Sequence, residues 1–206
     1  MASHPPPPRT PHRQIRASYD EETITVYQAY SQAIAGPAVQ GQRLSASPAF
    51  SHARMTWIKP SWAWMMYRCG YSYKDRGQER VLAIRMKHEH FMRLLSQAVV
   101  CHGQTLSAEE RGKGVRVQWD PERTPNLHVL PYRSIQIGIA GKVSKVWAEE
   151  WIVGIDDVTE RARRLREVVE KEGGVKLVEL VEGGLVPEER VYDVPEDLRK
   201  VLQMEE

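Results

Sequence analysis

Apolar and polar residues alternate or repeat along the chain in short stretches, and the period of each stretch predicts its secondary structure. Residues 81–86 have an apolar, β-branched core that predicts a buried strand. In residues 115–119 apolar and polar side chains alternate, which predicts a strand with one solvent-exposed face. Apolar residues at helical spacing predict a helix from residue 88 to about residue 100. Cap residues at 156–159 and the Gly173-Gly174 pair delimit a helix over 160–172.

Acidic residues at 20–22 precede an apolar run and predict a helix that ends at Gly36-Pro37. The rest of the pattern predicts a loop over 41–51, a turn at 120–123, a strand over 130–139 leading into a helix that ends near 150, an edge strand over 175–180 and a short helix over 196–202. No βαβ rhythm is visible. We therefore predict an α+β fold, a single compact domain with a mixed, mostly antiparallel sheet and flanking helices.

The 206 residues suffice for one domain, which we place over residues 13–206. Residues 1–12 are rich in proline and lack an apolar segment, which predicts a disordered tail and no secretory signal. No apolar run reaches the length of roughly 20 residues that a membrane span needs. These features predict an intracellular, cytoplasmic protein that does not bind membranes.

The charge is nearly balanced, with a formal net charge of +2 and 27% charged residues, so any nucleic-acid binding has to come from a local patch. Cys69 and Cys101 supply neither a disulfide framework nor a full set of zinc ligands. No histidine motif of a zinc helix is present, and we predict no metal site. The oligomeric state does not follow from these features.

Residues 55–71 concentrate aromatic side chains and methionines around two cations, and no other stretch of the chain resembles them. Aromatic faces can stack on a ring, and a flanking lysine and arginine can hold an anion, so this run suits a nucleotide-sized ligand. The predicted ligand-binding residues are Trp57, Lys59, Trp62, Tyr67 and Arg68. The competing interpretation is that the aromatic residues form part of the core.

Two further features carry charge outside this run. Arg13 and Arg16 lie three residues apart, so on a helix they would share a face and could clamp a phosphate, although solvated charges are an equal alternative. Glu122 follows a predicted strand and is a candidate acid, with a salt-bridged turn as the alternative.

Several segments together resemble the domain-of-unknown-function family numbered 4291. They comprise residues 13–17, 26–30, 55–70, 78–84, 117–123 and 133–138. The resemblance spans roughly residues 13–200, and the aromatic run makes it specific. It implies a fold unit without an established activity, so it adds no mechanism.

A second resemblance concerns short pieces only. Arg133, Ser134 and Gln136 are similar to the strands by which ADP-ribosyltransferases hold NAD, and Glu149 or Glu150 would then be the catalytic glutamate. The first hypothesis is therefore a nucleotide-handling, ADP-ribosyltransferase-like enzyme. The sequence identifies no cofactor, but this hypothesis would require NAD. The alternative is a non-catalytic module that binds single-stranded nucleic acid or a modified base.

Overall fold

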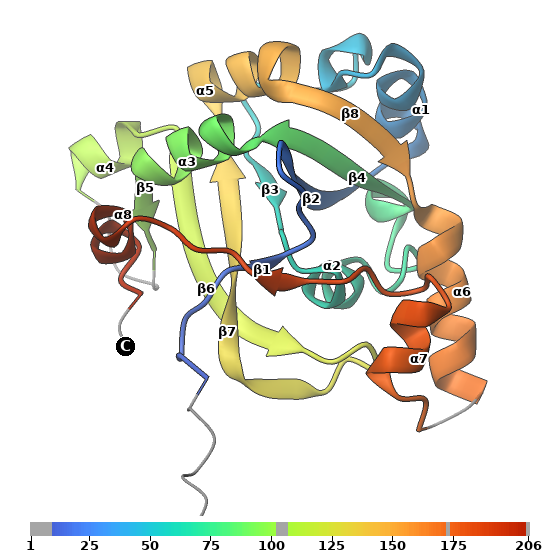
Figure 1. The fold of residues 1–206 in the computed structure, drawn as a ribbon. Coiled ribbons are helices and arrows are strands. Elements are labelled where there is room, and N and C mark those ends of the chain that lie inside the picture. The colour runs from blue at the N-terminus through green and yellow to red at the C-terminus, as the bar shows by residue number, and fades with distance from the viewer. Residues whose placement is uncertain (1–9, 102–106, 172–173, 205–206) are drawn as a thin grey trace, which may run out of the picture.

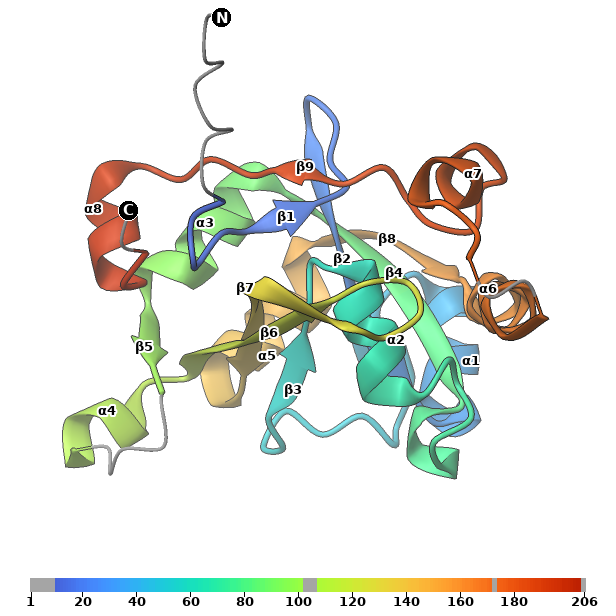
Figure 2. The same cartoon turned by 90° about the horizontal axis from the view of Figure 1, so that it is seen from below.

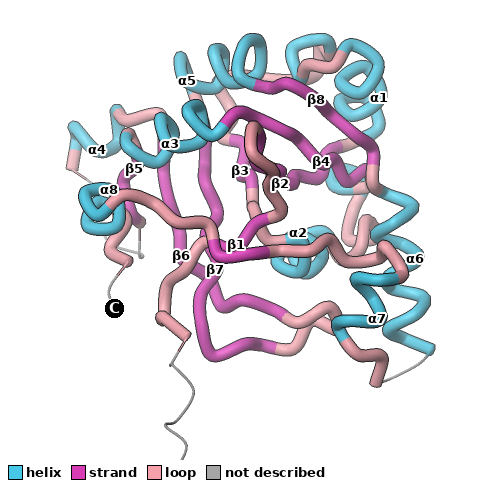
Figure 3. Tube along the Cα trace, in the orientation of Figure 1, coloured by secondary structure: helices cyan, strands magenta, loops and turns pink. Residues whose placement is uncertain are grey.

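The computed structural model describes residues 10–101, 107–171 and 174–204, which form one compact α+β domain of nine strands and eight α-helices. Strands fill the middle of the molecule and most helices lie around them, as the secondary-structure colours of Figure 3 show. Helix α2 (Trp62–Cys69) is the exception, because it lies among the strands. No helix in the described part of the chain combines the length and the apolar character that crossing a membrane requires.

The first sheet contains three antiparallel strands in the order β2-β4-β8, which are β2 (Thr23–Tyr30), β4 (Arg80–Lys87) and β8 (Ile152–Asp157). Every residue of β2 has a partner in β4, from Thr23 opposite Lys87 to Tyr30 opposite Arg80. Residues 81–84 of the central strand are all buried, as expected of a strand that is covered on both faces.

The second sheet has the order β3-β7-β6-β5 and comprises β3 (Thr56–Ile58), β7 (Val129–Ile139), β6 (Val115–Arg123) and β5 (Ala98–Val100). Its pairs are antiparallel except β5 with β6. The two sheets meet at Tyr27 and Lys59, which exchange backbone hydrogen bonds of 2.7 and 2.9 Å. Lys59 is thereby fixed at the junction of the sheets.

Side chains alternate across these strands and create two cores. The larger core contains Ile24 and Ile84 of the first sheet together with Val117 and Ile137 of the second. The opposite face of β2 and β4 carries the smaller core, which α2 (Trp62–Cys69) completes with Trp62 and other apolar side chains. Helix α2 therefore packs on apolar residues along the first sheet and reaches β6 of the second.

The ends of α2 follow from the sequence. The Ser61 hydroxyl accepts a hydrogen bond from the amide of Trp64 at 3.1 Å, which is the role of an N-cap serine. Gly70 takes a left-handed conformation with φ of 55°, which ends the helix as a glycine commonly does. Both caps hold the cations and aromatic residues of residues 55–71 in fixed positions.

The remaining helices surround the sheets: α1 (Gln32–Gly41), α3 (His88–Ser96), α4 (Ala108–Gly112), α5 (Gly141–Val146), α6 (Thr159–Lys171), α7 (Leu177–Glu182) and α8 (Glu196–Val201). A π-helical turn (Trp147–Trp151) extends α5, and short 3-10 turns lie at Leu44–Ala46 and Arg76–Gln78. The view from below in Figure 2 places α6 and α7 side by side at one end of the molecule and α4 and α8 at the other.

The C-terminal segment crosses the surface between those two ends. Its short strand β9 (Arg190–Val191) pairs with β1 (Arg16–Ala17), and Figure 1 shows the two strands running side by side across the front of the molecule. Arg13 donates to the backbone carbonyl of Gln203 at 2.7 Å, which fixes the chain beyond α8. The two ends of the described chain therefore hold each other in place.

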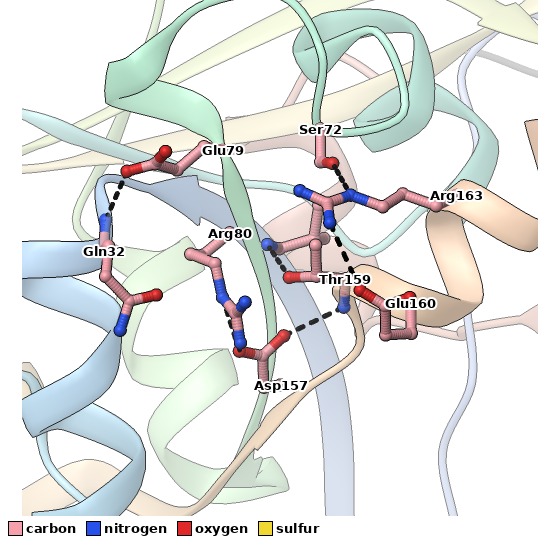
Figure 4. Close-up of polar contacts among 9 residues, drawn as sticks. Gln32, Ser72, Glu79, Arg80, Asp157, Thr159, Glu160 and Arg163 are labelled. Atoms are coloured by element: carbon pink, nitrogen blue, oxygen red, sulfur yellow. Dashed lines mark hydrogen bonds and ion pairs between the residues drawn. The ribbon is translucent and has the colours of Figure 1, made fainter.

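A polar network anchors α6 to the first sheet (Figure 4). The Asp157 carboxylate accepts hydrogen bonds from the Thr159 amide at 3.0 Å and from Arg80 at 2.8 Å, while the Thr159 hydroxyl accepts from the Val81 amide at 2.9 Å. Arg163 on α6 donates to Ser72 at 2.9 Å. The first turn of α6 is thus tied to β4 and to the loop after α2.

The predicted fold class is confirmed, and so are the strands at 81–86, 115–119 and 130–139 and the helix at 160–172. Four local predictions are wrong. The helix predicted over 88 to about 100 ends at Ser96, and residues 98–100 form β5 beside β6. Residues 23–30 form a strand because they pair with β4 along its whole length, and α1 begins afterwards and includes Pro37. Residues 120–123 continue β6 instead of turning, and residues 177–182 form a helix whose Leu180 fills the smaller core.

The prediction for the proline-rich tail falls mostly on residues 1–9, which lie outside the described residues. Of the last three residues of that tail, His12 is held in place: its backbone carbonyl accepts a hydrogen bond of 2.7 Å from the Arg133 amide.

Candidate functional site

A row of polar side chains lies on the face of β6 and β7 that is turned away from the larger core. Gln118 pairs with Gln136 across the two strands, and Asp120 pairs with Ser134. The Gln136 amide donates to Asp120 at 2.6 Å and to Gln118 at 3.0 Å. Gln118 and Gln136, at one end of this row, line a first cavity. Glu122, at the other end, lines a second cavity.

The lysine cavity, named here for Lys59, has a volume of about 660 Å³. The lining combines three cations, one carboxylate, several amides and aromatic rings: Arg54, Lys59, Arg68, Asp75, Gln28, Gln78, Gln118, Gln136, Tyr30, Phe50 and Trp57. Its volume lies within the range of small-molecule sites, roughly 300–1,000 Å³. Trp57, Lys59, Arg68 and Gln136 are four of the residues that the sequence predicted to bind a ligand.

Lys59 is the most unusual residue of the lysine cavity because its side chain is only 3% exposed. Its ammonium group donates to Gln28 Oε1 at 3.2 Å and to the carbonyl of Trp57, both neutral acceptors. Burial and then the charge of Arg68 lower the pKa of Lys59 to about 7. No carboxylate of the described residues lies within ion-pair distance of the Lys59 ammonium, so this cation has no direct counterion among them.

Asp120 is a carboxylate whose charge acts on Lys59 and opposes the lowering of its pKa. Burial raises the pKa of the Asp120 carboxyl above its usual value, while its hydrogen bond with Gln136 and the charge of Arg68 oppose that change. A partly buried carboxyl with a raised pKa does not fully balance two cations. The lysine cavity therefore keeps an excess of positive charge near Lys59 and Arg68.

The aromatic residues of the run have different positions. Trp57 lines the lysine cavity, whereas Trp62 is fully buried in the smaller core, as the competing interpretation had predicted. Tyr67 stacks on Trp64 with ring centroids 5.1 Å apart, and the Arg123 guanidinium lies 3.9 Å from its ring. The structure thus leaves Trp57 as the predicted aromatic residue that faces the lysine cavity.

Glu122 lies at a second cavity, the glutamate cavity, which has a volume of about 790 Å³. It is 4% exposed and accepts hydrogen bonds from the Ser61 hydroxyl at 2.9 Å and the Arg123 amide at 2.8 Å. Burial raises the pKa of its carboxyl, against these hydrogen bonds and one from Ser134. Ser134, which the sequence predicted to bind a ligand, therefore forms a hydrogen bond with the Glu122 carboxylate of the protein itself.

Arg13 and Arg16 do not form a shared phosphate clamp, because this segment is extended rather than helical. Arg16 lies in β1 at the glutamate cavity. Arg13 and Arg133 line a separate hollow of about 520 Å³, next to Cys101 and Asp120. Arg133 donates to the carbonyl of Trp119 at 2.8 Å, so both arginines of that hollow hold parts of the chain together.

The structure places Glu149 and Glu150 apart from the other predicted site residues. Both are exposed on the π-helical turn, and neither lines the lysine cavity or the glutamate cavity. Glu149 lies 3.9 Å from His52, which directly follows the lining residue Ser51. It is thus near the rim of the lysine cavity.

Residues 14–192 match a family described as a domain of unknown function (DUF4291). The chain belongs to this family. The match confirms the resemblance found in the sequence, and it includes every residue that lines the lysine and glutamate cavities of this DUF4291 protein. A comparison with curated proteins found none that matches the chain.

Sequence reasoning missed three residues that the fold brings to these cavities of the DUF4291 protein. Gln28 belongs to a segment predicted as a helix, Tyr132 is one of many aromatic residues, and Glu189 lies in a polar segment without a recognisable motif. Nothing in their local sequence marks them. Among the described residues, no group of three or more histidine, cysteine or acidic side chains is arranged to hold a metal ion.

Proposed function

We propose that this DUF4291 protein binds a nucleotide in the lysine cavity. The observation that carries the proposal is the buried ammonium group of Lys59, which has neutral acceptors, a neighbouring arginine and no ion pair with a described carboxylate. A buried cation without a counterion is costly, and an anionic ligand at Lys59 and Arg68 would supply one. A phosphate group has the charge and the acceptor oxygens for this role.

The remainder of the cavity lining suits the other parts of a nucleotide. Trp57, Tyr30 and Phe50 offer aromatic surface for a base, and the amides of Gln28 and Gln118 can hydrogen-bond to polar ring edges. Arg54 is exposed and adds a third positive charge to the lining. Phosphate recognition at one end and stacking on aromatic residues would together favour a nucleotide over inorganic phosphate.

The most concrete form of the proposal is an ADP-ribosyltransferase-like reaction with NAD. Glu149 is then the first candidate for the catalytic acid, because it contacts His52 beside the cavity rim. Glu150 is exposed on the same turn, and Glu122 belongs to the other cavity. This form of the proposal predicts that the protein releases nicotinamide from NAD in addition to binding NAD.

Titration calorimetry with AMP, ADP-ribose, NAD and adenosine tests the proposal. We expect the phosphorylated compounds to bind and adenosine to bind at least tenfold more weakly. Arg68→Gln should weaken binding of AMP without lowering the melting temperature, whereas Arg164→Gln, an exposed arginine on α6, should bind like the parent protein.

Equal affinity for adenosine and AMP would refute phosphate recognition at Lys59 and Arg68. Binding of single-stranded oligonucleotides alone, with a steep dependence on salt, would instead support the nucleic-acid-binding alternative. Nicotinamide release that survives in Glu149→Gln would contradict the catalytic role assigned to Glu149.

A further inference from the structure

The glutamate cavity has one polar side and one apolar side. Its polar side is formed where the N-terminus of α2 meets β1, β6 and residues 186–189, with Arg16, Ser61, Glu122, Tyr132 and Glu189. Its apolar side comes mainly from α7 and the residues around it: Val175, Leu177, Val178, Leu180, Val181 and Val186. Leu177 and Val178 are more than half exposed, at 57% and 55%. An apolar wall is thus available beside two carboxyl groups.

The two glutamates share the same pattern of contacts. In each, one oxygen accepts hydrogen bonds at the start of α2: Glu122 Oε1 from the Ser61 hydroxyl at 2.9 Å, and Glu189 Oε1 from the Trp62 amide at 2.6 Å. Glu189 Oε2 accepts no hydrogen bond from a described residue. Glu189 lines the cavity, so its carboxyl group is available to a ligand there.

Neighbouring cations do not neutralise these carboxylates by direct contact. Arg16 donates to the side chain of Gln14 and to the backbone carbonyl of Glu189, both at 3.3 Å. Arg161 donates to the carbonyl of Leu185 at 3.2 Å and lies over the ring of Trp62. Neither arginine forms an ion pair with Glu122 or Glu189 among the described residues.

We propose that the glutamate cavity is a second ligand site, which binds the ammonium group of an amine at Glu122 and Glu189 and its hydrocarbon part against α7. An ammonium donates up to three hydrogen bonds and fits between two acceptors, while a carboxylate ligand would add a third negative group. The proposal does not rest on nucleotide binding, because it uses a different cavity and different residues.

Binding of an amine is coupled to a proton. Burial and the charge of Glu122 raise the pKa of Glu189 to about 8, against the hydrogen bond from the Trp62 amide and the charges of Arg16 and Arg161. Glu189 is therefore mostly protonated at neutral pH, and a bound ammonium takes the place of that proton. The other charged or titratable groups that line the cavity or act on Glu189 are Tyr27, Arg123, Tyr132 and Glu188. As the pH is raised toward 8, the affinity for the amine should therefore increase by up to about tenfold per pH unit.

Three six-carbon probes that differ only in their head group test the site: hexylamine, hexanol and hexanoate. Binding is measured by the shifts of amide signals in ¹H–¹⁵N spectra of the full chain. We expect hexylamine to shift signals of Leu177, Leu180 and Val181 at least tenfold more strongly than hexanol at equal concentration, and hexanoate to leave them unchanged. The hexylamine affinity should increase from pH 6 to pH 8.

Glu189→Gln should abolish most of the hexylamine response and its pH dependence, whereas Glu182→Gln, an exposed glutamate at the end of α7, should keep both. Equal responses to hexanol and hexylamine would overturn the proposal, and so would no response to hexylamine. If Glu189→Gln does not fold, the pH series on the parent protein decides, since an affinity independent of pH contradicts the exchange of a proton for the amine. Loss of nucleotide binding would leave all these results unchanged.

Discussion

Replacing Lys59 by methionine should change how the stability of the protein depends on pH. Methionine has a similar length and no charge, so Lys59→Met keeps most of the packing while it removes the ammonium group and its hydrogen bonds to Gln28 and Trp57. The pKa of Lys59 is about 7 in the folded protein, against 10.5 for an ordinary lysine, chiefly because of burial.

The sign of the effect follows from these two values. Between about pH 7 and the ordinary value of 10.5, the unfolded chain binds a proton at Lys59 that the folded protein has already released. The free energy of unfolding therefore rises with pH in this range. From about pH 7 to about pH 9 the rise due to Lys59 is about 2 kcal/mol, which follows from 1.36 kcal/mol per pKa unit and half-protonation at the starting pH.

Urea denaturation at both pH values measures the effect as a double difference. The free energy of unfolding of the parent protein should rise by about 2 kcal/mol more than that of Lys59→Met, since the methionine has nothing to titrate. Cysteines and tyrosines that also titrate in this range contribute to both proteins and largely cancel. Lys142→Met, which removes an exposed lysine on α5, should show no such difference from the parent protein.

A double difference under about 0.5 kcal/mol would refute the reasoning. It would mean that the ammonium of Lys59 is solvated in the folded protein, and the main support for an anion site in the lysine cavity would be lost. A carboxylate that stabilises the ammonium would give the same small difference, because both states would then keep the proton throughout this pH range. The result would appear without any ligand, so the test does not depend on finding the nucleotide.

Two further predictions concern the fold. Burial alone would raise the pKa of Asp157, but hydrogen bonds from Thr159 and the charge of Arg80 outweigh it and lower the pKa, so Asp157→Ala should cost about 1–3 kcal/mol at neutral pH. This cost should disappear as the pH falls below 3.8, the ordinary value for the carboxyl, and urea denaturation over that range would show it. Gly114→Ala should lower the urea midpoint, because a Cβ there would lie 2.8 Å from a backbone oxygen, whereas Gly112→Ala has open space and should change stability by less than about 0.5 kcal/mol.

The sequence predicted the strands at 81–86, 115–119 and 130–139, because their apolar patterns depend only on local residues. It failed where long-range pairing decided the structure. Residues 23–30 look helical after three acidic residues, yet β4 offers a partner for each of them. Residues 175–180 were predicted to be an alternating edge strand, but residues 177–182 are helical and bury Leu180 in the smaller core.

The candidate site was predictable only in part for the same reason. Lys59 and Arg68 drew attention because they interrupt an apolar segment, and the fold does bring both to one cavity. Their partners come from β2, β6 and β7, and no spacing in the sequence links Gln28 to Gln136. Glu189 is over 120 residues from Trp62, the residue whose amide donates a hydrogen bond to it, so the pair of glutamates becomes visible only in three dimensions.

The two cavities have opposite charge requirements, and one helix contributes to both. At the lysine cavity, Lys59 and Arg68 form no ion pair with a carboxylate of the described residues. At the glutamate cavity, Glu122 and Glu189 form no ion pair with a cation of the described residues. Arg68 near the end of α2 reaches the first cavity, and Ser61 and the Trp62 amide at its start hold the carboxylates of the second. The two proposals therefore call for ligands of opposite sign, an anion at Lys59 and Arg68 and a cation at Glu122 and Glu189.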